Sequence, residues 1–247
     1  MKLLVTAGNT QVPIDRVRCI TNRFTGKTGA LIALEAYHRD HAVTLLTSNP
    51  AAVSGLKSVP EGPRWSVYPF QTFEELQREM GAAVKSDSFD AVVHSAAVSD
   101  FLLEGIFGLR DDTRFDLQTG SWTGSAPSLA DRSAAKIKSN EPELWLRLVR
   151  APKLVDCVRS DWHFQGILVK FKLEVGASET QLLEIAEASR KQSQADIMVA
   201  NTLEGAAEWA MLGPLQGQYE RVEREDLPRR LLEAIEDLVP EDTEEIE

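Results

Sequence analysis

The sequence predicts an α/β protein with a Rossmann-like, doubly wound and mainly parallel sheet that has helices on both faces. The alternation of two kinds of segment leads to this fold class. Short apolar runs of strand length alternate with amphipathic stretches of helical length through most of the 247 residues. Such alternation is typical of a parallel sheet built from strand–helix units. In these sheets, ligands bind at the carboxyl ends of the strands, so the loops after Ala7, Leu46 and Val98 are the first candidates for a site.

In the first half of the chain, apolar runs bounded by turns predict strands, and apolar residues at helical spacing predict helices. Thr72 followed by Glu75 has the pattern of a capping box, which marks a helix start. The expected elements are a strand over 3–7, a helix over about 26–39, a strand over 42–46, a helix from Thr72 to about 85, and a strand over 90–98.

The segment from about 100 to 139 differs, because it is rich in Gly, Asp, Ser and Thr and poor in apolar pairs. Plain loops of this length are uncommon in compact domains, so the segment is expected to be a flexible lid or an insertion. Regular elements resume after it. They are a strand over 144–149, a helix from Pro152 to about 162, a strand over 166–173, a helix over 179–192 capped by Ser178, a strand over 196–200, a hairpin over 210–222 and a final helix over 226–238.

The expected organisation is a single nucleotide-binding domain over 1–240, followed by an acidic tail over 241–247. The net charge of −11 argues against nucleic acid as the main partner, although local cations and backbone amides still allow a small anionic ligand. Cys19 and Cys157 are not in CxxC spacing, which favours a reducing cytoplasm. No signal peptide or long apolar stretch predicts a membrane association.

The turn after the first strand is a candidate phosphate site. Gly8, Asn9 and Thr10 form a small-residue turn, and Gly26–Gly29 opens the next helix, so backbone amides can approach an anion there. The dinucleotide fingerprint GxGxxG is absent. The GKT at Gly26 is no P-loop, because Thr21 stands where the earlier glycine is needed. An ordinary strand-to-helix turn remains the alternative.

No Tyr-x-x-x-Lys pair exists, since His41, Thr72 and Glu223 stand four residues after the three tyrosines. This argues against a short-chain reductase that uses NAD(P). The loop around Asn22 carries several cations, including Arg18 and Lys27. It is either a solvated loop or an anion site with an amide directed at an acyl phosphate oxygen.

Residues 12–29, with the sequence VPIDRVRCITNRFTGKTG, closely resemble the signature PIDxVRxIxNxSSGxxG of phosphopantothenoylcysteine synthetases. Further segments resemble motifs of the same family, in the same order, and together they span roughly residues 1–238. These segments are 94–101 (HSAAVSDF), 135–138 (AKIK), 152–155 (PKLV), 171–174 (FKLE) and 195–201 (ADIMVAN).

The resemblance implies a ligase of coenzyme A biosynthesis that joins 4'-phosphopantothenate to L-cysteine through an acyl-nucleotide. By their place in the motifs, Asn22 would hold the intermediate, Arg18 would support its turnover and Lys136 would close on the phosphates. The expected nucleotide-binding residues are Gly8, Asn9, Thr10, Lys27, His94, Ser95, Ala96, Asp100, Pro152, Lys153, Leu154, Val155 and Phe171.

The resemblance also implies a nucleoside triphosphate, CTP or ATP with CTP favoured, and Mg²⁺ held mainly by that nucleotide, with no protein metal site. Because the chain begins at the synthetase strand, we expect a free-standing form without a flavin domain or a flavin. A cytoplasmic homodimer is the expected assembly.

The chain departs from the family pattern at several positions. Ser139 replaces the last lysine of the lysine motif, and Lys170 stands where a small residue is usual. Ser189 and Ser193 match positions at which bifunctional members carry a lysine pair, with the neighbouring Arg190 and Lys191 as candidate substitutes. These departures keep a second hypothesis open, namely a non-catalytic or repurposed nucleotide-binding module of the same fold.

Overall fold

A computed structural model describes residues 1–54, 60–110, 113–123 and 127–239. Contacts between Cα atoms divide the chain into two compact units. Unit 1 comprises Met1–Thr10, Arg23–Val98 and Lys153–Glu247, and unit 2 comprises Gln11–Asn22 and Ser99–Pro152. The predicted acidic tail, 241–247, lies outside the described residues.

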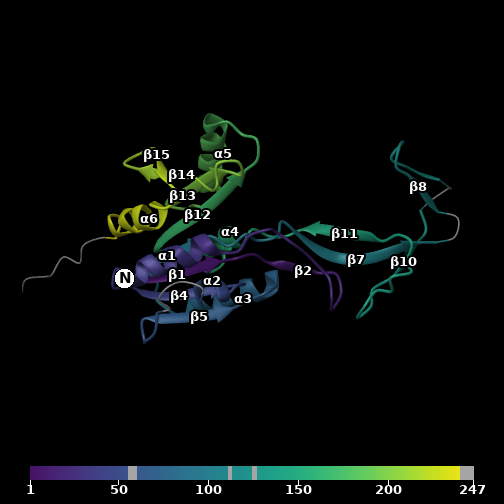
Figure 1. Cartoon of the computed structure of the whole chain (residues 1–247), viewed down its shortest axis with the longest axis horizontal. Helices are drawn as coiled ribbons and strands as arrows, with labels where there is room; N and C mark the ends of the chain where they lie inside the picture. Colours follow the sequence, from purple (N-terminus) through teal and green to yellow (C-terminus); the bar gives the residue numbers. More distant parts are fainter. Residues whose placement is uncertain (55–59, 111–112, 124–126, 240–247) are drawn as a thin grey trace, which may run out of the picture. The chain divides into compact units, whose positions relative to one another are not determined.

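Unit 1 is built on an eight-stranded sheet in the order β15-β14-β13-β12-β6-β1-β4-β5 (Figure 1). Its strands are β1 (Lys2–Ala7), β4 (Ala42–Thr47), β5 (Trp65–Pro69), β6 (Ala91–His94), β12 (Ile167–Glu174), β13 (Ile197–Thr202), β14 (Trp209–Leu215) and β15 (Gln218–Glu223). The first six are parallel, and β14 and β15 form an antiparallel C-terminal hairpin. Counted along the chain, the parallel strands have the order 3-2-1-4-5-6 of the doubly wound fold, so the predicted fold class is confirmed.

Helices cover both faces of this sheet. They are α1 (Lys27–His38), the short α2 (Ala51–Ser54), α3 (Phe73–Ser86), α4 (Leu154–Ser160), α5 (Glu179–Gln192) and α6 (Leu227–Glu236). α1 and α6 share one buried core with alternate residues of the central strands. α5 packs through Leu182 and Ala186 against Met198 and Ala200 of β13, which belong to a separate core cluster. No helix of the described residues is long and apolar enough to cross a membrane.

The helix starts follow the local sequence closely. Thr72 forms the predicted capping box with Glu75. Ser178 is the predicted cap of α5, and it also forms a capping box, with Gln181. The predicted start of α4 at Pro152 is wrong. Lys153 keeps an extended backbone and is the N-cap, so the helix begins two residues later.

Unit 2 contains only strands among its described residues. They are the hairpin β2 (Gln11–Pro13) and β3 (Cys19–Thr21), the pair β8 (Arg114–Asp116) and β9 (Ser121–Thr123), and the sheet β10-β7-β11 formed by β10 (Leu129–Asp131), β7 (Phe101–Leu109) and β11 (Trp145–Arg150). The sequence did not predict β7, because Gly105 and Gly108 interrupt its apolar pattern. Both glycines make room for side chains, those of Phe107 and Arg132.

Candidate functional site

The first candidate site lies at the carboxyl edge of the sheet in unit 1. β1 lies between β4 and β6, so successive connections leave it in opposite directions, which is the usual position of a ligand crevice. The loops after β1, β4 and β6 meet there. Ala97 N donates to Gly8 O at 2.8 Å, and Asn9 N donates to Ser48 Oγ at 2.9 Å. The loops after β1, β4 and β6 therefore lie together, although the third begins after His94 and not after the predicted Val98.

Three glycines bring the start of α1 against this edge. Gly26 is the N-cap of α1 with φ +78°, and a Cβ on it would lie 2.6 Å from Gly8 N. A Cβ on Gly29 would lie 2.5 Å from Ser95 Oγ. Gly8, Gly26 and Gly29 thus form a tight turn and a close helix–strand contact, although residues 11–22 between them belong to unit 2. Since such glycines let backbone amides approach an anion, the candidate phosphate turn is sterically suited to that role.

Thr6 organises the end of β6. Its Oγ1 lies 3.0 Å from His94 Nδ1 and accepts a hydrogen bond from Ala96 N at 3.2 Å, while Ser95 Oγ donates to Thr6 O at 2.7 Å. The backbone of the predicted nucleotide-binding residues 94–96 is therefore fixed from β1. In the sequence, Thr6 belongs to the candidate turn after the first strand, but nothing there indicates that it binds the loop after β6. The one available signal of a structural role was a hydroxyl within an otherwise apolar strand, and Thr6 is buried.

The His94 side chain is buried, and this burial, with the positive charge of Lys170 nearby, lowers the pKa of His94 from 6.5 to about 4. The folded protein thus keeps His94 neutral, while the unfolded chain takes up a proton below about pH 6.5. Its stabilising contribution is complete above that pH and is lost as the pH falls toward 4. We expect the free energy of unfolding to decrease by ~3 kcal/mol over this range from His94 alone, at ~1.4 kcal/mol per pKa unit.

Urea unfolding at about pH 7.5 and about pH 4.5 measures this dependence. The His94→Gln variant should show a smaller decrease between the two values than the unaltered chain. The His163→Asn variant is a control, because His163 is exposed and Asn accepts its left-handed backbone, φ +55°. Equal decreases in all three proteins would contradict the expectation.

In unit 2, Asp15 joins the signature loop to the lysine motif. Its Oδ1 accepts from the backbone N–H groups of Val17 and Arg18, both at 2.8 Å. Its Oδ2 accepts from Arg18 Nη2 at 2.5 Å and from Ile137 N at 3.1 Å. Arg18 Nη2 also donates to Ile137 O at 3.0 Å, and Arg16 N donates to Ala135 O at 3.0 Å.

These bonds hold Lys136 beside the loop that carries Arg18, because both neighbours of Lys136 are hydrogen-bonded to that loop.

The Arg18 guanidinium and the backbone N–H of Val17 hold the pKa of Asp15 well below its usual range. The carboxylate thus keeps its charge, and the stabilisation it gives is present above ~pH 4 and is lost only in stronger acid. In the sequence, Asp15 is one of several polar residues of the signature loop, and nothing there indicates that it connects this loop to the lysine motif.

For the ligase reaction that the motif resemblance implies, we expect Asp15→Asn to lower kcat about tenfold or more, because an amide in this position directs a donor at Arg18 or at a backbone N–H. Steady-state kinetics measures the change. Asp116→Asn is the matched control. Asp116 also accepts backbone N–H bonds in a turn of unit 2, from Gln118 at 2.8 Å and Thr119 at 3.4 Å, without contacting either motif. An equal loss of kcat in both variants would count against a specific role of Asp15.

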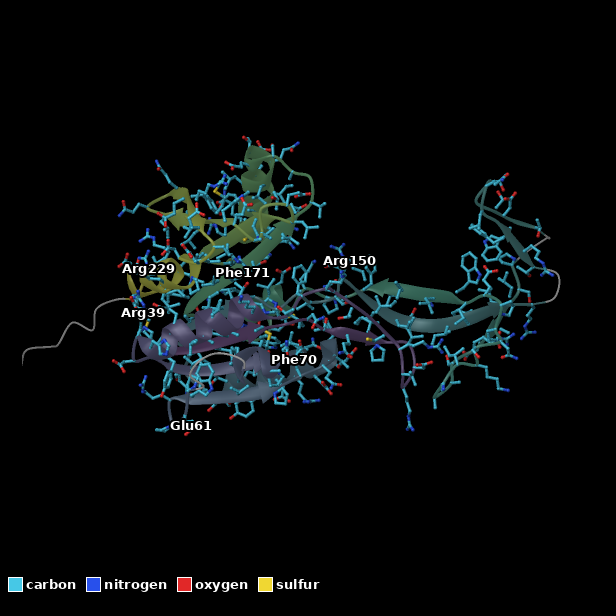
Figure 2. All side chains as sticks on the ribbon, viewed as in Figure 1. Arg39, Glu61, Phe70, Arg150, Phe171 and Arg229 are labelled. Atoms are coloured by element: carbon cyan, nitrogen blue, oxygen red, sulfur yellow. The ribbon has the colours of Figure 1, made fainter. Side chains whose placement is uncertain are left out.

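The predicted site residues are divided between the units. Unit 2 holds Arg18, Asn22, Asp100, Lys136 and Pro152, and unit 1 holds Gly8, Asn9, Thr10, Lys27, His94, Ser95, Ala96, Lys153, Leu154, Val155 and Phe171. The side chains of Leu154 and Val155 are buried in the core, so only their backbone at the start of α4 is available to a ligand. Phe171, labelled in Figure 2, packs against the core shared with α1 and α6.

The described residues contain no group of three or more His, Cys, Asp or Glu side chains placed to hold one metal ion.

The family described as DNA/pantothenate metabolism flavoprotein C-terminal domain matches residues 1–107 and 128–232. The chain belongs to this family. The resemblance to phosphopantothenoylcysteine synthetases read from the motifs is thereby confirmed at the level of the family.

Two similar curated proteins are longer than this chain. The coenzyme A biosynthesis bifunctional protein CoaBC of Thermococcus kodakarensis is 30% identical over 243 residues, which cover 96% of this chain and 51% of that protein. CoaBC of Escherichia coli K12 is 26% identical over 201 residues, which cover 81% of this chain and 41% of that protein. The chain thus spans about half the length, or less, of these relatives.

Two solved structures have a fold similar to that of this chain. The DNA/pantothenate metabolism flavoprotein from Streptococcus pneumoniae has a TM-score of 0.75 at 27% identity, covering 97% of this chain and 100% of that one. A Cab2 variant in complex with phosphopantothenate-cysteine has a TM-score of 0.68 at 17% identity, covering 96% of this chain and 86% of that one. At this lower identity, the second likeness supports the fold alone.

Proposed function

We propose that this chain is a ligase of coenzyme A biosynthesis that condenses 4'-phosphopantothenate with L-cysteine through an acyl-nucleotide. The observation that carries the proposal is the Asp15 bridge. It places the signature loop with Arg18 beside the lysine motif with Lys136, two segments about 120 residues apart in the chain. Membership of the family, and relatives named for coenzyme A biosynthesis, support the same reaction.

The proposed reaction has two displacements. In the first, a carboxylate oxygen of 4'-phosphopantothenate attacks the α-phosphorus of the nucleoside triphosphate, and the bond to the β-phosphate oxygen breaks to release pyrophosphate. In the second, the amine of cysteine attacks the acyl carbon, and the nucleoside monophosphate leaves as the amine loses a proton. Both steps bring anions together or develop negative charge, so positioned cations and amide donors are the catalytic need.

The chain's own residues meet this need in distinct ways. Arg18 directs Nε and Nη2 at Asp15, which fixes its guanidinium and leaves Nη1 to donate to a ligand oxygen. We assign the Asn22 amide to the acyl phosphate and the exposed Lys136 to the polyphosphate. Mg²⁺, when bound to the nucleotide, supplies further neutralisation of the phosphate charge.

We also propose a co-substrate and an assembly for this ligase. CTP is the favoured co-substrate and ATP the alternative, and a cytoplasmic homodimer is the proposed assembly. A lid role for the segment around 100–139 also stays a prediction. Light scattering tests the assembly, since the mass of a single chain would count against the dimer.

Pyrophosphate release with 4'-phosphopantothenate and Mg²⁺ tests the reaction, with CTP compared to ATP and with cysteine present or absent. Release that requires 4'-phosphopantothenate and is sustained by cysteine is the expected result, and the faster nucleotide identifies the co-substrate. No release with either nucleotide, from protein that still binds a nucleotide, would instead favour the repurposed module. The serines at 139, 189 and 193 are the features that favour this second candidate.

A further inference from the structure

Lys170 is a buried cation in the sheet of unit 1 that the reaction described above does not use. It lies on β12, and its side chain is directed to the face that carries α4 and α5, opposite to Phe171. Only 9% of the residue is exposed. Its Nζ donates to the backbone oxygen of Ser189 at 3.0 Å and to Ser193 Oγ. Ser193 Oγ in turn donates to Asp156 Oδ1 on α4 at 2.5 Å.

These two hydrogen bonds hold the Lys170 ammonium in place, but neither acceptor carries a negative charge. In the part of the chain that the structure describes, no carboxylate lies within ion-pair distance of Nζ, and the nearest negative charge is reached through the Ser193 hydroxyl. An ammonium has three donors, and two of them are directed at the protein oxygens of Ser189 and Ser193. A buried cation with a donor to spare is costly alone and favourable beside an anion.

The surroundings of Lys170 favour an anionic ligand. Burial lowers the pKa of Lys170, Asp156 opposes this effect, and the positive charges of Lys153 and Lys172 add to the lowering. His94 lies directly beside it in the register of β6 and β12 and is held neutral. The Lys170 backbone thus lies level with the last residue of β6, and Lys153 and Lys172 are close enough to act on its ammonium.

The two residues considered as substitutes for a lysine pair on α5 are engaged elsewhere. Arg190 binds Glu187 through both Nε and Nη2 at 2.8 Å, and its Nη1 donates to Ala195 O. The side chain of Lys191 is 70% exposed and lies 3.4 Å from Glu187. By contrast, the ammonium of Lys170 lies between Ser189 and Ser193 themselves. A cation from the strand thus occupies the place between these two serines.

We propose that Lys170 binds an anionic oxygen of the nucleoside triphosphate, and that Ser193 and Asp156 position its ammonium for this contact. The inference rests on the proposed function for the identity of the anion. The competing explanation is that Lys170 only caps the carbonyl end of α5, as cations near a helix C-terminus do. A capping role predicts lower stability with unchanged nucleotide affinity, so the two explanations differ in a measurable way.

The experiment measures the Kd of CTP and of ATP by calorimetry, the KM of each substrate and the thermal midpoint of the full chain. Lys170→Met removes the charge and keeps the length of the side chain. Lys170→Met combined with Ser193→Lys returns an ammonium to the same place from α5. Lys172→Met is the matched control, because Lys172 lies two residues further along β12 and pairs with Glu174 at 2.8 Å.

Lys170→Met should raise the Kd and KM for the nucleotide about tenfold or more, while the KM for 4'-phosphopantothenate stays within about twofold. The combined variant should recover most of the affinity, and Lys172→Met should change it far less than Lys170→Met, because the Lys172 ammonium is paired with Glu174. Should Lys170→Met not fold, NMR of lysine side chains in the unaltered protein gives the same test. The Lys170 signal is expected to shift on addition of nucleotide and not on addition of 4'-phosphopantothenate.

Unchanged nucleotide affinity in Lys170→Met, or an unmoved Lys170 signal at saturating nucleotide, would overturn the inference and leave Lys170 as a helix cap. Failure of the proposed function is recognised separately. In that case the unaltered protein releases no pyrophosphate, whichever residue stands at position 170.

Discussion

Asn22→Ala should lower the rate of product formation about 100- to 1000-fold, because the loss of one preorganised donor to a developing oxyanion has an effect of this size. Asn22 follows β3 directly, in the loop whose shape depends on the Asp15 bonds to Val17 and Arg18. Its side-chain amide is the neutral donor that we assign to the acyl phosphate. The substitution removes this donor and leaves the cations of the loop in place.

Single-turnover assays locate the effect of Asn22→Ala. Pyrophosphate release and conversion of the acyl-nucleotide should be measured separately, with labelled 4'-phosphopantothenate. Gln165→Ala is the control, since Gln165 is an exposed amide residue in the loop before β12, outside the segments assigned to the reaction. Asn22→Ala with a rate close to that of this control would refute the assignment and favour the repurposed module.

Gly26→Ala should destabilise the protein by about 2–4 kcal/mol and abolish nucleotide binding. Two causes add. An alanine at φ +78° costs ~1–2 kcal/mol, and its Cβ would lie 2.6 Å from Gly8 N, where the backbone cannot yield without moving β1 or α1. Moving either element opens the turn in which Gly8 and Gly26 meet at the carboxyl edge of the sheet.

Gly176→Ala separates the two causes. Gly176 has a similar φ of +67°, but a Cβ there meets no atom within 4 Å. It should therefore show only the smaller cost of the left-handed backbone and keep full nucleotide affinity. Urea unfolding and calorimetry measure both variants. If Gly26→Ala were no more destabilised than Gly176→Ala, the close approach of α1 to β1 would not be important.

Much of the fold could be predicted because its determinants are local. The apolar run of β1, the helical spacing of α1 and the capping boxes at Thr72 and Ser178 lie within a few residues of sequence. One failure was local, because two glycines within β7 interrupt its apolar pattern. Another was not local: β6 ends at His94 rather than at the predicted Val98, because the loop after it turns back to bond the distant Gly8.

The sequence predicted individual residues of the candidate site, but not the hydrogen bonds that join the segments carrying them. The motifs selected Arg18, Asn22 and Lys136, and they indicated the loops at the strand ends. They did not indicate that Asp15 connects two of these segments, or that Thr6 holds the backbone of the loop after β6. The periodicity of apolar residues carries no information about such hydrogen bonds, because they depend on which distant segments of the chain pack against each other.

The sequence by itself therefore determined the α/β class, the helix caps at Thr72 and Ser178, and the family. Only the tertiary structure brought Gly26 against Gly8, Ile137 against Asp15, and the ammonium of Lys170 between Ser189 and Ser193. The physical reason is that the two kinds of interaction act over different separations along the chain. Helix and strand formation depends on neighbours within one or two turns, whereas these contacts depend on strand order and register, which result from the packing of the whole sheet.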